Sequence, residues 1–277
     1  MNIVLFGASG FIGRRIAQLL RERGHQLRTP SSREINFLQP DPNRLPELFA
    51  GQDAVVNAVG VMSRHAQVLE AVHHHTPRLL AQHAQQAGVK RWVQLSALGA
   101  DAADSVCFTG SKGRGDAAVR DSGLSVAVAR PSVVYGRGGA SCELFIKLAR
   151  LPVLVLPDGG SFLLQPVHVN DVAAALARLC ESDDTDTFTL TGGSRLTLAA
   201  YLNTLRRTLH GKPAAAVWTL PLPLLRPVLP TAKYLSNGML SPDSITLLQR
   251  GSTGDNQAFA ALLGREPLAA EAFARKD

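Results

Sequence analysis

The stretch MNIVLFGASGFIG, residues 1–13, decides the fold. Its apolar run IVLF is typical of a buried strand in a parallel sheet, and the segment 11–23 after it has the apolar spacing of a helix that packs on that strand. Between them, Gly7 permits a tight turn, Gly10 lets backbone N–H groups approach a pyrophosphate, and Gly13 allows the helix to pack closely. Because the helix N-terminus adds a positive dipole end, the stretch predicts a dinucleotide-binding turn.

The composition is that of a folded globular protein. The 277 residues suffice for one large α/β domain or one domain with a small appendage, and 45% hydrophobic with 18% charged residues is an ordinary balance. No apolar run approaches the roughly 20 residues that span a bilayer, and no secretory leader pattern is visible. We therefore expect a cytoplasmic protein. Cys107, Cys142 and Cys180 are expected to be reduced thiols, because their spacing suits neither disulfides nor zinc.

The net charge of +7 favours anionic partners. The arginines are spread along many predicted helices, and aromatic residues make up only 5% of the chain, so a basic groove with stacking platforms is not indicated. A phosphate-rich cofactor and a solvated basic surface explain the charge more simply. Nucleic acid is therefore not an expected partner.

Strand and helix patterns alternate through the first two-thirds of the chain, which is typical of βαβ units with a parallel sheet. The pattern predicts an α/β fold with a Rossmann-type doubly wound sheet in residues 1–195, and a smaller C-terminal region, 196–277, packed against it on the substrate side. The predicted strands are 2–6, 25–30, 53–58, 90–95, 124–129 and 187–191, and the predicted helices are 11–23, 64–87, 109–122, 141–150, 171–182 and 197–210.

Two apolar segments lie outside this alternation. A hairpin-like region is expected between the predicted helix 141–150 and Val169. The segment LPLPLLRPVLP, residues 220–230, is too short and too broken by proline to span a bilayer, and we expect a buried connection there in preference to a lipid contact. A further helical segment is expected after SPDSI, residues 241–245.

Four motifs in this order carry a family resemblance. They are the glycine turn, DAVVNAVG at 53–60, SALGA at 96–100 and SKG at 111–113. The chain resembles the short-chain dehydrogenase/reductase superfamily in its atypical and extended branch. It is most similar there to NmrA-like and NAD-dependent epimerase/dehydratase-like proteins related to the nucleotide-binding accessory subunit of respiratory complex I. The resemblance runs to about Leu198, and LLGREP at 262–267 extends it more weakly.

The resemblance implies which positions contact the cofactor. Ser96 falls at the family's serine, which hydrogen-bonds the substrate, and Lys112 falls at the lysine that holds the nicotinamide ribose. A serine after a buried strand also makes a plain turn, and Lys112 can also be read as an exposed helical lysine. The other implied positions are Gly7, Ser9, Gly10, Phe11, Ile12 and Gly13 at the pyrophosphate, Asn36 and Phe37 beside the adenine, Ala58, Val59 and Gly60 along the adenosine, and Pro131, Ser132 and Val133 beside the nicotinamide.

One position departs from the family pattern. Active members carry tyrosine four residues before the lysine, because a phenol beside an ammonium group can pass a proton to the substrate oxygen. This chain has Phe108 there, and a phenyl ring has no proton to give. None of the three tyrosines precedes a lysine by four residues. We therefore expect weak, altered or no dehydrogenase activity.

Other groups are weighed as substitutes for the phenol. Cys107 is read as a small buried thiol, His168 as a residue that orients the loop before a helix, and Tyr135 as a packed ring, each in preference to a proton-transfer role. The run His73–His75 is read as a solvated helix face. Adjacent helical residues point about 100° apart, so these histidines are not expected to share an ion, and no metal site is predicted.

The segment about 20 residues past the glycines indicates the cofactor. Ser31, Ser32 and Arg33 suit the 2′-phosphate of NADP(H), because arginine can bind it through two hydrogen bonds. Glu34 is evidence for NAD(H) instead, since a small shift of the loop would bring a carboxylate to the ribose of that cofactor. NADP(H) is favoured over NAD(H).

Three functions remain open from the sequence. The first is an NAD(P)(H)-binding protein of the atypical short-chain dehydrogenase/reductase type with little or no dehydrogenase activity. The second is an active oxidoreductase or epimerase-like enzyme with a proton donor other than tyrosine. The third is an assembly or membrane-peripheral partner protein with a nucleotide-binding fold.

Overall fold

The computed structural model describes residues 1–221 and 242–275, which divide into two compact units. The first unit comprises Met1–Pro131 and Val172–Thr189, and the second comprises Ser132–Asp171 and Leu190–Asp277. This division differs from the predicted boundary after residue 195, because Ser132–Asp171 associates with the C-terminal part of the chain.

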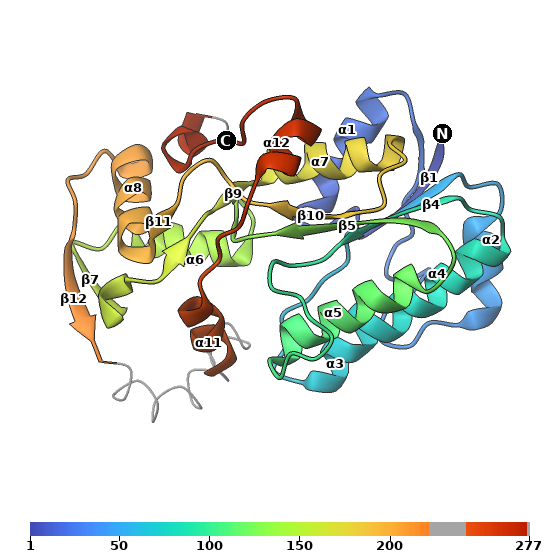
Figure 1. The fold of residues 1–277 in the computed structure, drawn as a ribbon, viewed down its shortest axis with the longest axis horizontal. Helices are drawn as coiled ribbons and strands as arrows, with labels where there is room; N and C mark the ends of the chain where they lie inside the picture. Colours follow the sequence, from blue (N-terminus) through green and yellow to red (C-terminus); the bar gives the residue numbers. More distant parts are fainter. Residues whose placement is uncertain (222–241, 276–277) are drawn as a thin grey trace. The chain divides into compact units, whose positions relative to one another are not determined.

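The first unit is built on a six-stranded sheet in the order β10-β5-β4-β3-β1-β2 (Figure 1). Neighbouring strands from β2 to β5 pair in parallel, and β10 lies beside β5, where the predicted strand 187–191 was expected to rejoin the sheet. The predicted α/β fold with a Rossmann-type parallel sheet is confirmed. The strands are β1 (Asn2–Phe6), β2 (Gln26–Arg28), β3 (Ala54–Asn57), β4 (Arg91–Leu95), β5 (Ser125–Pro131) and β10 (Thr187–Leu190).

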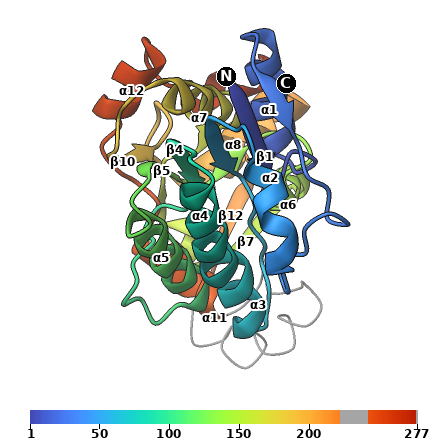
Figure 2. The same ribbon diagram turned by 90° about the vertical axis from the view of Figure 1, so that its right-hand side faces the viewer.

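Helices cover both faces of this sheet. Figures 1 and 2 show α4 and α5 side by side on one face and α1 and α7 on the other. Phe6 of β1 and Trp92 of β4 point to the first of these faces, where they pack with Leu80 of α4 and Val119 of α5. The helices are α1 (Gly13–Glu22), α2 (Leu45–Phe49), α3 (Ala66–Glu70), α4 (Thr76–Gln86), α5 (Cys107–Arg120) and α7 (Val169–Glu181), with a short 3₁₀ turn at Pro42–Arg44.

The predicted helix 64–87 is interrupted. A π-helical segment, Ala71–His75, separates α3 from α4. A π turn adds a residue to the helical repeat and changes which side chains face the sheet. Sequence periodicity assumes one repeat throughout, which is why it predicted a single continuous helix.

In its described residues the second unit contains three two-stranded sheets and its own core around Tyr201 and Leu202. The predicted hairpin before Val169 is wrong, because its strands pair with distant segments instead of with one another. Thus β7 pairs with β12 in parallel, β8 with β11 antiparallel and β9 with β6 in parallel. The bounds are β6 (Val134–Tyr135), α6 (Ala140–Leu148), β7 (Val153–Pro157), β8 (Leu163–Leu164), β9 (Val167–His168), β11 (Leu196–Thr197), α8 (Leu198–His210), β12 (Ala216–Leu220), α11 (Pro242–Arg250) and α12 (Gln257–Leu263), with 3₁₀ turns at Asp158–Gly160 and Ala270–Arg275.

Most of the predicted connection at 220–230 lies outside the described residues, since the description stops at residue 221 and resumes at 242. The helix expected after SPDSI is α11, which already begins at Pro242. Within the described ranges, no helix has both the length and the apolar character needed to cross a membrane.

Helix α5 contacts its neighbours through three glycines. A Cβ at Gly110 would lie 2.5 Å from the carbonyl oxygen of Asp104, and one at Gly113 would lie 2.2 Å from the carbonyl carbon of Asp101. At Gly115, a Cβ would lie 1.8 Å from the carbonyl oxygen of His73. These backbone contacts leave no room for a side chain. The close packing offsets the cost of placing glycine, which has a low helix propensity, inside a helix.

Substitution of Gly115 tests this packing. We expect Gly115→Ala to lower the free energy of unfolding by about 3 kcal/mol, because the clash is with backbone that cannot rotate away. Gly88→Ala is the matched control: Gly88 has a φ of +82° and open space around it, so we expect a loss of about 1 kcal/mol. Urea denaturation measures both, and equal losses would contradict the packing explanation.

Candidate functional site

The glycine turn at the end of β1 is held by backbone contacts. Gly7 has a φ of +80°, and a Cβ on it would lie 2.9 Å from the carbonyl group of Ala58. The N–H of Gly10 donates to the carbonyl oxygen of Gly7 at 2.9 Å. Gly13 begins α1, and a Cβ on it would lie 2.0 Å from that same oxygen. The turn and the close helix packing that the spacing predicts are therefore both present.

The first turn of α1 is free to meet an anion. Among the described side chains, none caps this turn, and its own first residues include no acid. The N–H groups of Arg14 and Arg15 donate to the carbonyl oxygens of Gly10 and Ile12, so it is the helix dipole that favours a negatively charged group at this end. Beside it, Arg15 donates to the carbonyl oxygen of Phe11 at 2.9 Å, and its guanidinium lies 4.9 Å from the centre of the Phe11 ring.

The segment after β3 links the glycine turn to α5. The N–H of Ala58 donates to the carbonyl oxygen of Phe6 at 3.0 Å, and the N–H of Val59 donates to the Asn57 side chain at 3.2 Å. A Cβ on Gly60 would lie 3.3 Å from Nζ of Lys112. Three segments that the sequence predicts at the cofactor are thus adjacent: the glycine turn, residues 58–60 and the lysine of α5.

Lys112 is buried, with only 4% of its surface exposed, so the alternative of an exposed helical lysine is excluded. Its Nζ donates to the carbonyl oxygen of Leu95 at 3.0 Å. Burial lowers the pKa of Lys112 to about 8, and the nearby Asp116 carboxylate acts in the opposite direction. The ammonium group is therefore held in place at the carboxyl end of β4 and is poorly solvated there.

Ser96 belongs to a buried polar cluster next to this lysine. Its hydroxyl donates to Oδ2 of Asp116 at 2.7 Å, and the same oxygen accepts from Nη2 of Arg130 at 2.9 Å. Burial raises the pKa of Asp116, while the hydrogen bonds from Ser96 and Arg130 oppose that shift. In this arrangement the Ser96 hydroxyl can accept a hydrogen bond from a ligand, but its own proton is directed at Asp116. The cluster ties β4, α5 and β5 together.

Phe108 lies in the first turn of α5, four residues before Lys112. Its ring packs edge-on against the His73 ring, with 5.5 Å between the ring centres. Cys107 is the first residue of the same helix and is partly exposed, which corrects the expectation of a buried thiol. The position where the family pattern has a phenol is therefore filled by a ring of the same shape without an ionisable proton.

The structure corrects the prediction that His73 faces solvent. Only 1% of its surface is exposed. Its Nε2 accepts from the N–H of Val61 at 3.1 Å, so the ring proton is on Nδ1, which donates to Oγ of Ser111 at 3.0 Å. That hydroxyl in turn donates to the carbonyl oxygen of Phe108. Burial, and secondarily the charge of Lys112, lowers the pKa of His73 to about 2 and keeps the ring neutral.

His73 was missed although the sequence held a signal for it. The residue follows Leu69 by four positions and precedes Thr76 and Leu80 by three and seven, and all three are buried on the face of the helix that meets the protein interior. A polar residue on the apolar spacing of a helix is expected to be buried with partners. His73 connects the segment after β3 to α5.

The other two histidines of the run, His74 and His75, lie close to Glu70. Ligand atoms of Glu70, His74 and His75 are within 4.8 Å of one another, and the His74 and His75 rings are 4.6 Å apart. The two rings meet although adjacent helical residues point in different directions, so the spacing argument alone does not separate these ligand atoms. Glu70 already accepts hydrogen bonds from Arg114 and His74, and Arg114 in particular lowers its pKa. A guanidinium on the carboxylate disfavours a cation at this cluster.

The segment predicted beside the adenosine ribose is an exposed turn. The N–H of Ser31 donates to Oε2 of Glu34 at 2.8 Å, and this hydrogen bond is the main cause of the lowered pKa of Glu34. Ser32 and Arg33 are exposed. The Glu34 carboxylate is thus engaged within its own turn, whereas the neighbouring hydroxyl and guanidinium face solvent.

The two residues predicted beside the adenine differ in burial. Phe37 packs edge-on against Phe6, with 5.7 Å between ring centres, and its carbonyl oxygen accepts from Thr76 at 2.8 Å. Asn36 is exposed, and its side-chain oxygen accepts from the N–H of Leu38 at 3.0 Å. The main chain here is fixed against the sheet and α4.

The residues predicted beside the nicotinamide divide between the units. Pro131 ends β5 in the first unit and accepts from the N–H of Leu98 at 2.9 Å. Ser132 belongs to the second unit, where its hydroxyl donates to the carbonyl oxygen of Gln165. Val133 packs against the core of that unit.

Tyr135 and His168 have packing roles. The Tyr135 ring stacks on Phe273 at 4.7 Å between centres, and both rings are fully buried. His168 is buried beside them, and its Nδ1 accepts from the N–H of Asn170 at 3.2 Å at the start of α7. These contacts match the expectation that His168 orients the segment before a helix and that Tyr135 is a packed ring.

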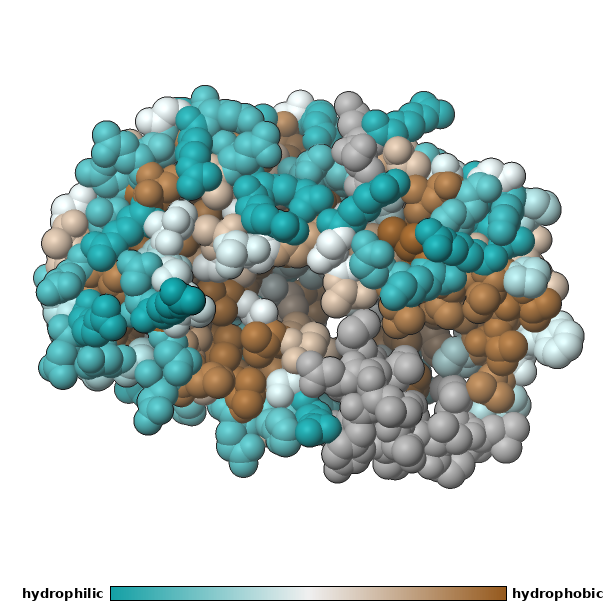
Figure 3. Space-filling model, turned by 180° about the vertical axis from the view of Figure 1, so that it is seen from behind, coloured by the Kyte–Doolittle hydropathy of each residue, from teal (hydrophilic) through white to brown (hydrophobic). Residues whose placement is uncertain are grey.

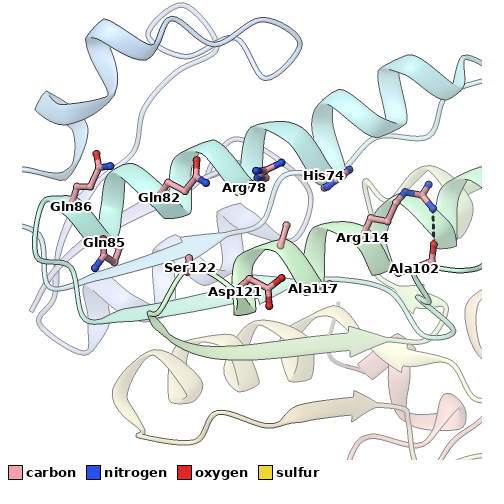
Figure 4. Close-up of a pocket in the computed structure, with 11 residues that line it drawn as sticks. His74, Arg78, Gln82, Gln85, Gln86, Ala102, Arg114, Ala117, Asp121 and Ser122 are labelled. Carbon is pink, nitrogen blue, oxygen red and sulfur yellow. Dashed lines mark hydrogen bonds between the residues drawn. The ribbon is translucent and has the colours of Figure 1, made fainter.

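A polar groove of about 730 Å³ lies elsewhere in the first unit, between α4 and α5. Figure 4 shows His74, Arg78 and Gln82 on one side of it and Arg114 and Asp121 on the other. The residues predicted at the cofactor lie in other parts of the described chain. The groove does not contribute to the candidate site.

Comparison with known proteins identifies the family. A family model described as NAD(P)H-binding matches residues 7–183, and the chain belongs to this NAD(P)H-binding family. It is 26% identical over 202 residues to NADH dehydrogenase (ubiquinone) 1 alpha subcomplex subunit 9, mitochondrial, of Arabidopsis thaliana, covering 65% of this chain and 50% of that protein. It is 28% identical over 195 residues to ceramide reductase of Caulobacter vibrioides, covering 65% and 61%. These matches confirm the resemblance seen in the sequence.

Solved structures share the fold. The dTDP-4-dehydrorhamnose reductase of Bacillus anthracis, in complex with NADP, has a TM-score of 0.74 at 12% identity and covers 99% of this chain and 97% of its own. Identity this low shows the fold alone. The aligned part of this chain spans between half and about three-fifths of the length of the two curated relatives.

The buried lysine has a measurable effect on stability. Because its folded-state pKa of about 8 is below the ordinary 10.5, the unfolded chain binds more protons between these values, and the folded state gains stability as pH rises through them. Relative to Lys112→Met, we expect the natural chain to gain up to about 3 kcal/mol over this interval. Urea denaturation at several pH values measures the difference, and parallel pH curves for the two proteins would contradict it.

Proposed function

We propose that this chain is an NADP(H)-binding protein of the atypical short-chain dehydrogenase/reductase type with weak or no dehydrogenase activity. The observation that carries the proposal is Phe108. The nearby elements, a buried Lys112 and a glycine turn without side-chain obstruction, suit a bound dinucleotide. The group that would exchange a proton with a substrate is replaced by phenyl. The chain therefore still binds the cofactor, but its dehydrogenase reaction is lost or altered.

The residues have distinct roles in this proposal. Gly7, Gly10 and Gly13 let the pyrophosphate approach the N-terminus of α1, and residues 58–60 lie along the adenosine. Lys112 donates to the ribose hydroxyls next to the nicotinamide. When bound, the cofactor supplies hydride chemistry, and the protein residues determine whether a proton can accompany it.

The preference for NADP(H) is supported by the exposed turn at 31–34. Oε2 of Glu34 accepts a hydrogen bond from the N–H of Ser31, which engages one of the two carboxylate oxygens within the turn itself. Arg33 and Ser32 are exposed and can meet a 2′-phosphate.

Calorimetric titration tests binding and preference together. We expect NADPH to bind at least about tenfold more tightly than NADH, because a guanidinium–phosphate pair adds roughly 1.4 kcal/mol or more. Arg33→Ala is expected to remove most of this preference while leaving NADH binding unchanged. Arg21→Ala, on the exposed last turn of α1, is a charge-matched control. Equal affinity for both cofactors, or no effect of Arg33→Ala, would contradict the preference.

Restoring the phenol tests the proposed loss of activity. We expect Phe108→Tyr to raise carbonyl reduction by NADPH about 100-fold or more above the natural chain, because a positioned acid contributes 10²–10⁴-fold. Phe108→Leu is the control for a changed side chain without a proton. NADPH absorbance is followed with a panel of carbonyl compounds, and the cofactor dissociation constant should stay the same.

A second candidate is an active reductase with a different proton donor. The buried Lys112 favours it, and one relative is named ceramide reductase. The same assay separates the candidates. Turnover by the natural chain that Phe108→Tyr does not increase, and that Lys112→Met abolishes, would support the second candidate and contradict the first.

A further inference from the structure

The second unit presents an apolar strand to solvent. Strand β12 pairs with β7, and among the described residues β7 is its single partner strand. Trp218 is 64% exposed, and its partner in the register, Val155, is 54% exposed. Val217 is also exposed, so side chains on both faces of β12 are open to water. Figure 3 shows apolar side chains gathered on this part of the surface, at the right of the view.

Such a strand is unusual for a surface that contacts only water. Exposed edge strands are normally protected by charges, by proline or by a covering element, and large exposed aromatic groups mark interaction sites. Trp92, the other tryptophan of the chain, is fully buried and hydrogen-bonded, and tryptophan is on average a highly buried residue. The exposure of Trp218 therefore points to a partner.

The charge around β12 indicates which kind of partner. From residue 187 to residue 221 the sequence contains no Asp or Glu, but it contains four cations: Arg195, Arg206, Arg207 and Lys212. One exposed acid, Asp158, directly follows β7 in a 3₁₀ turn that packs against β12. A basic segment with no acids attracts anionic surfaces and repels a second copy of itself. Pairing of β12 with β12 of another chain would bring two such segments together, so dimerisation through this edge is disfavoured.

The buried Arg206 fixes the backbone next to two cations, Arg150 and Lys212, near the starts of β7 and β12. Arg206 donates to the carbonyl oxygens of Ala149 and Leu151, and also to that of Pro213. These bonds hold the turn after α6 next to the segment that leads into β12. Arg150 and Lys212, both exposed, are the residues adjacent to these acceptors. Each of the two paired strands therefore begins within four residues of an exposed cation, Arg150 before β7 and Lys212 before β12.

We propose that β12, with Trp218, Val217 and Val155 as its apolar contacts and Lys212 and Arg150 beside it, docks on an anionic lipid bilayer. Tryptophan favours the boundary between lipid head groups and acyl chains, and lysine and arginine next to it favour anionic head groups. The contact is peripheral and does not depend on nucleotide binding. A protein that carries its own cofactor would thereby be held at a membrane surface.

Tryptophan fluorescence of the full chain tests this docking. Vesicles of phosphatidylcholine containing phosphatidylglycerol are compared with vesicles of phosphatidylcholine alone. We expect the anionic vesicles to shift the emission to shorter wavelength and to protect it from iodide quenching, because Trp218 leaves water. The shift should persist in Trp92→Phe, disappear in Trp218→Phe and weaken as salt is raised. Co-sedimentation measures binding in every variant, including the one without the reporter.

Charge reversal provides a matched pair of variants. Lys212→Glu is expected to weaken co-sedimentation with the anionic vesicles about tenfold. Lys90→Glu makes the same change in charge at an exposed lysine of the first unit and is expected to have a much smaller effect. Both variants should melt at the temperature of the natural chain, since both side chains are exposed.

Three results would overturn the proposal. The first is the absence of both the shift and co-sedimentation with anionic vesicles at low salt. The second is an equal effect of Lys212→Glu and Lys90→Glu. The third is a shift that develops without vesicles as the protein concentration rises, which would assign β12 to contact with a second copy. NADPH affinity is measured in parallel, so failure of docking is distinguishable from failure of the proposed nucleotide function.

Discussion

A close backbone contact at the start of the chain positions the rest of the candidate site. No Cβ fits at Gly7 against Ala58 or at Gly13 against Gly7, so β1, the segment after β3 and the first turn of α1 lie nearer to one another than side chains would permit. This contact exposes the N-terminus of α1 at the carboxyl end of the sheet, where an anion gains from the helix dipole. Lys112 then approaches Gly60 from the other side.

Buried polar groups fix the second half of the site. His73 joins the segment after β3 to α5, and Asp116 joins α5 to Ser96 and Arg130. Each group would be costly to bury alone, and each has hydrogen-bond partners on other elements, although among the described residues only Oδ2 of the Asp116 carboxylate is bonded. Their combined effect is to hold Lys112 in one place despite its burial. A phenyl ring at position 108 completes the same packing without adding an acid, which is consistent with retained binding and reduced chemistry.

The sequence predicted those parts of the molecule whose structure depends on residues close together along the chain. The glycine spacing and the alternation of strands and helices indicated the turn and the parallel sheet, because both depend on residues near one another in sequence. The apolar spacing around His73 signalled that it is buried, but its partners, Val61 and Ser111, come from other segments and only the fold brings them to it. The pairing of β7 with β12 was missed for the same reason, since about 60 residues separate the two strands. Pattern along one segment carries no information on such partners.

Hydrogen–deuterium exchange with and without NADPH tests the nucleotide site most directly. If the cofactor lies on the glycine turn, saturating NADPH should slow exchange at residues 7–14 and 58–61 and in the first turns of α5. Exchange in β12, which lies outside the candidate site, should stay the same and serves as an internal control. Unchanged exchange at residues 7–14 in the presence of saturating NADPH would contradict the assignment of this turn as the cofactor site.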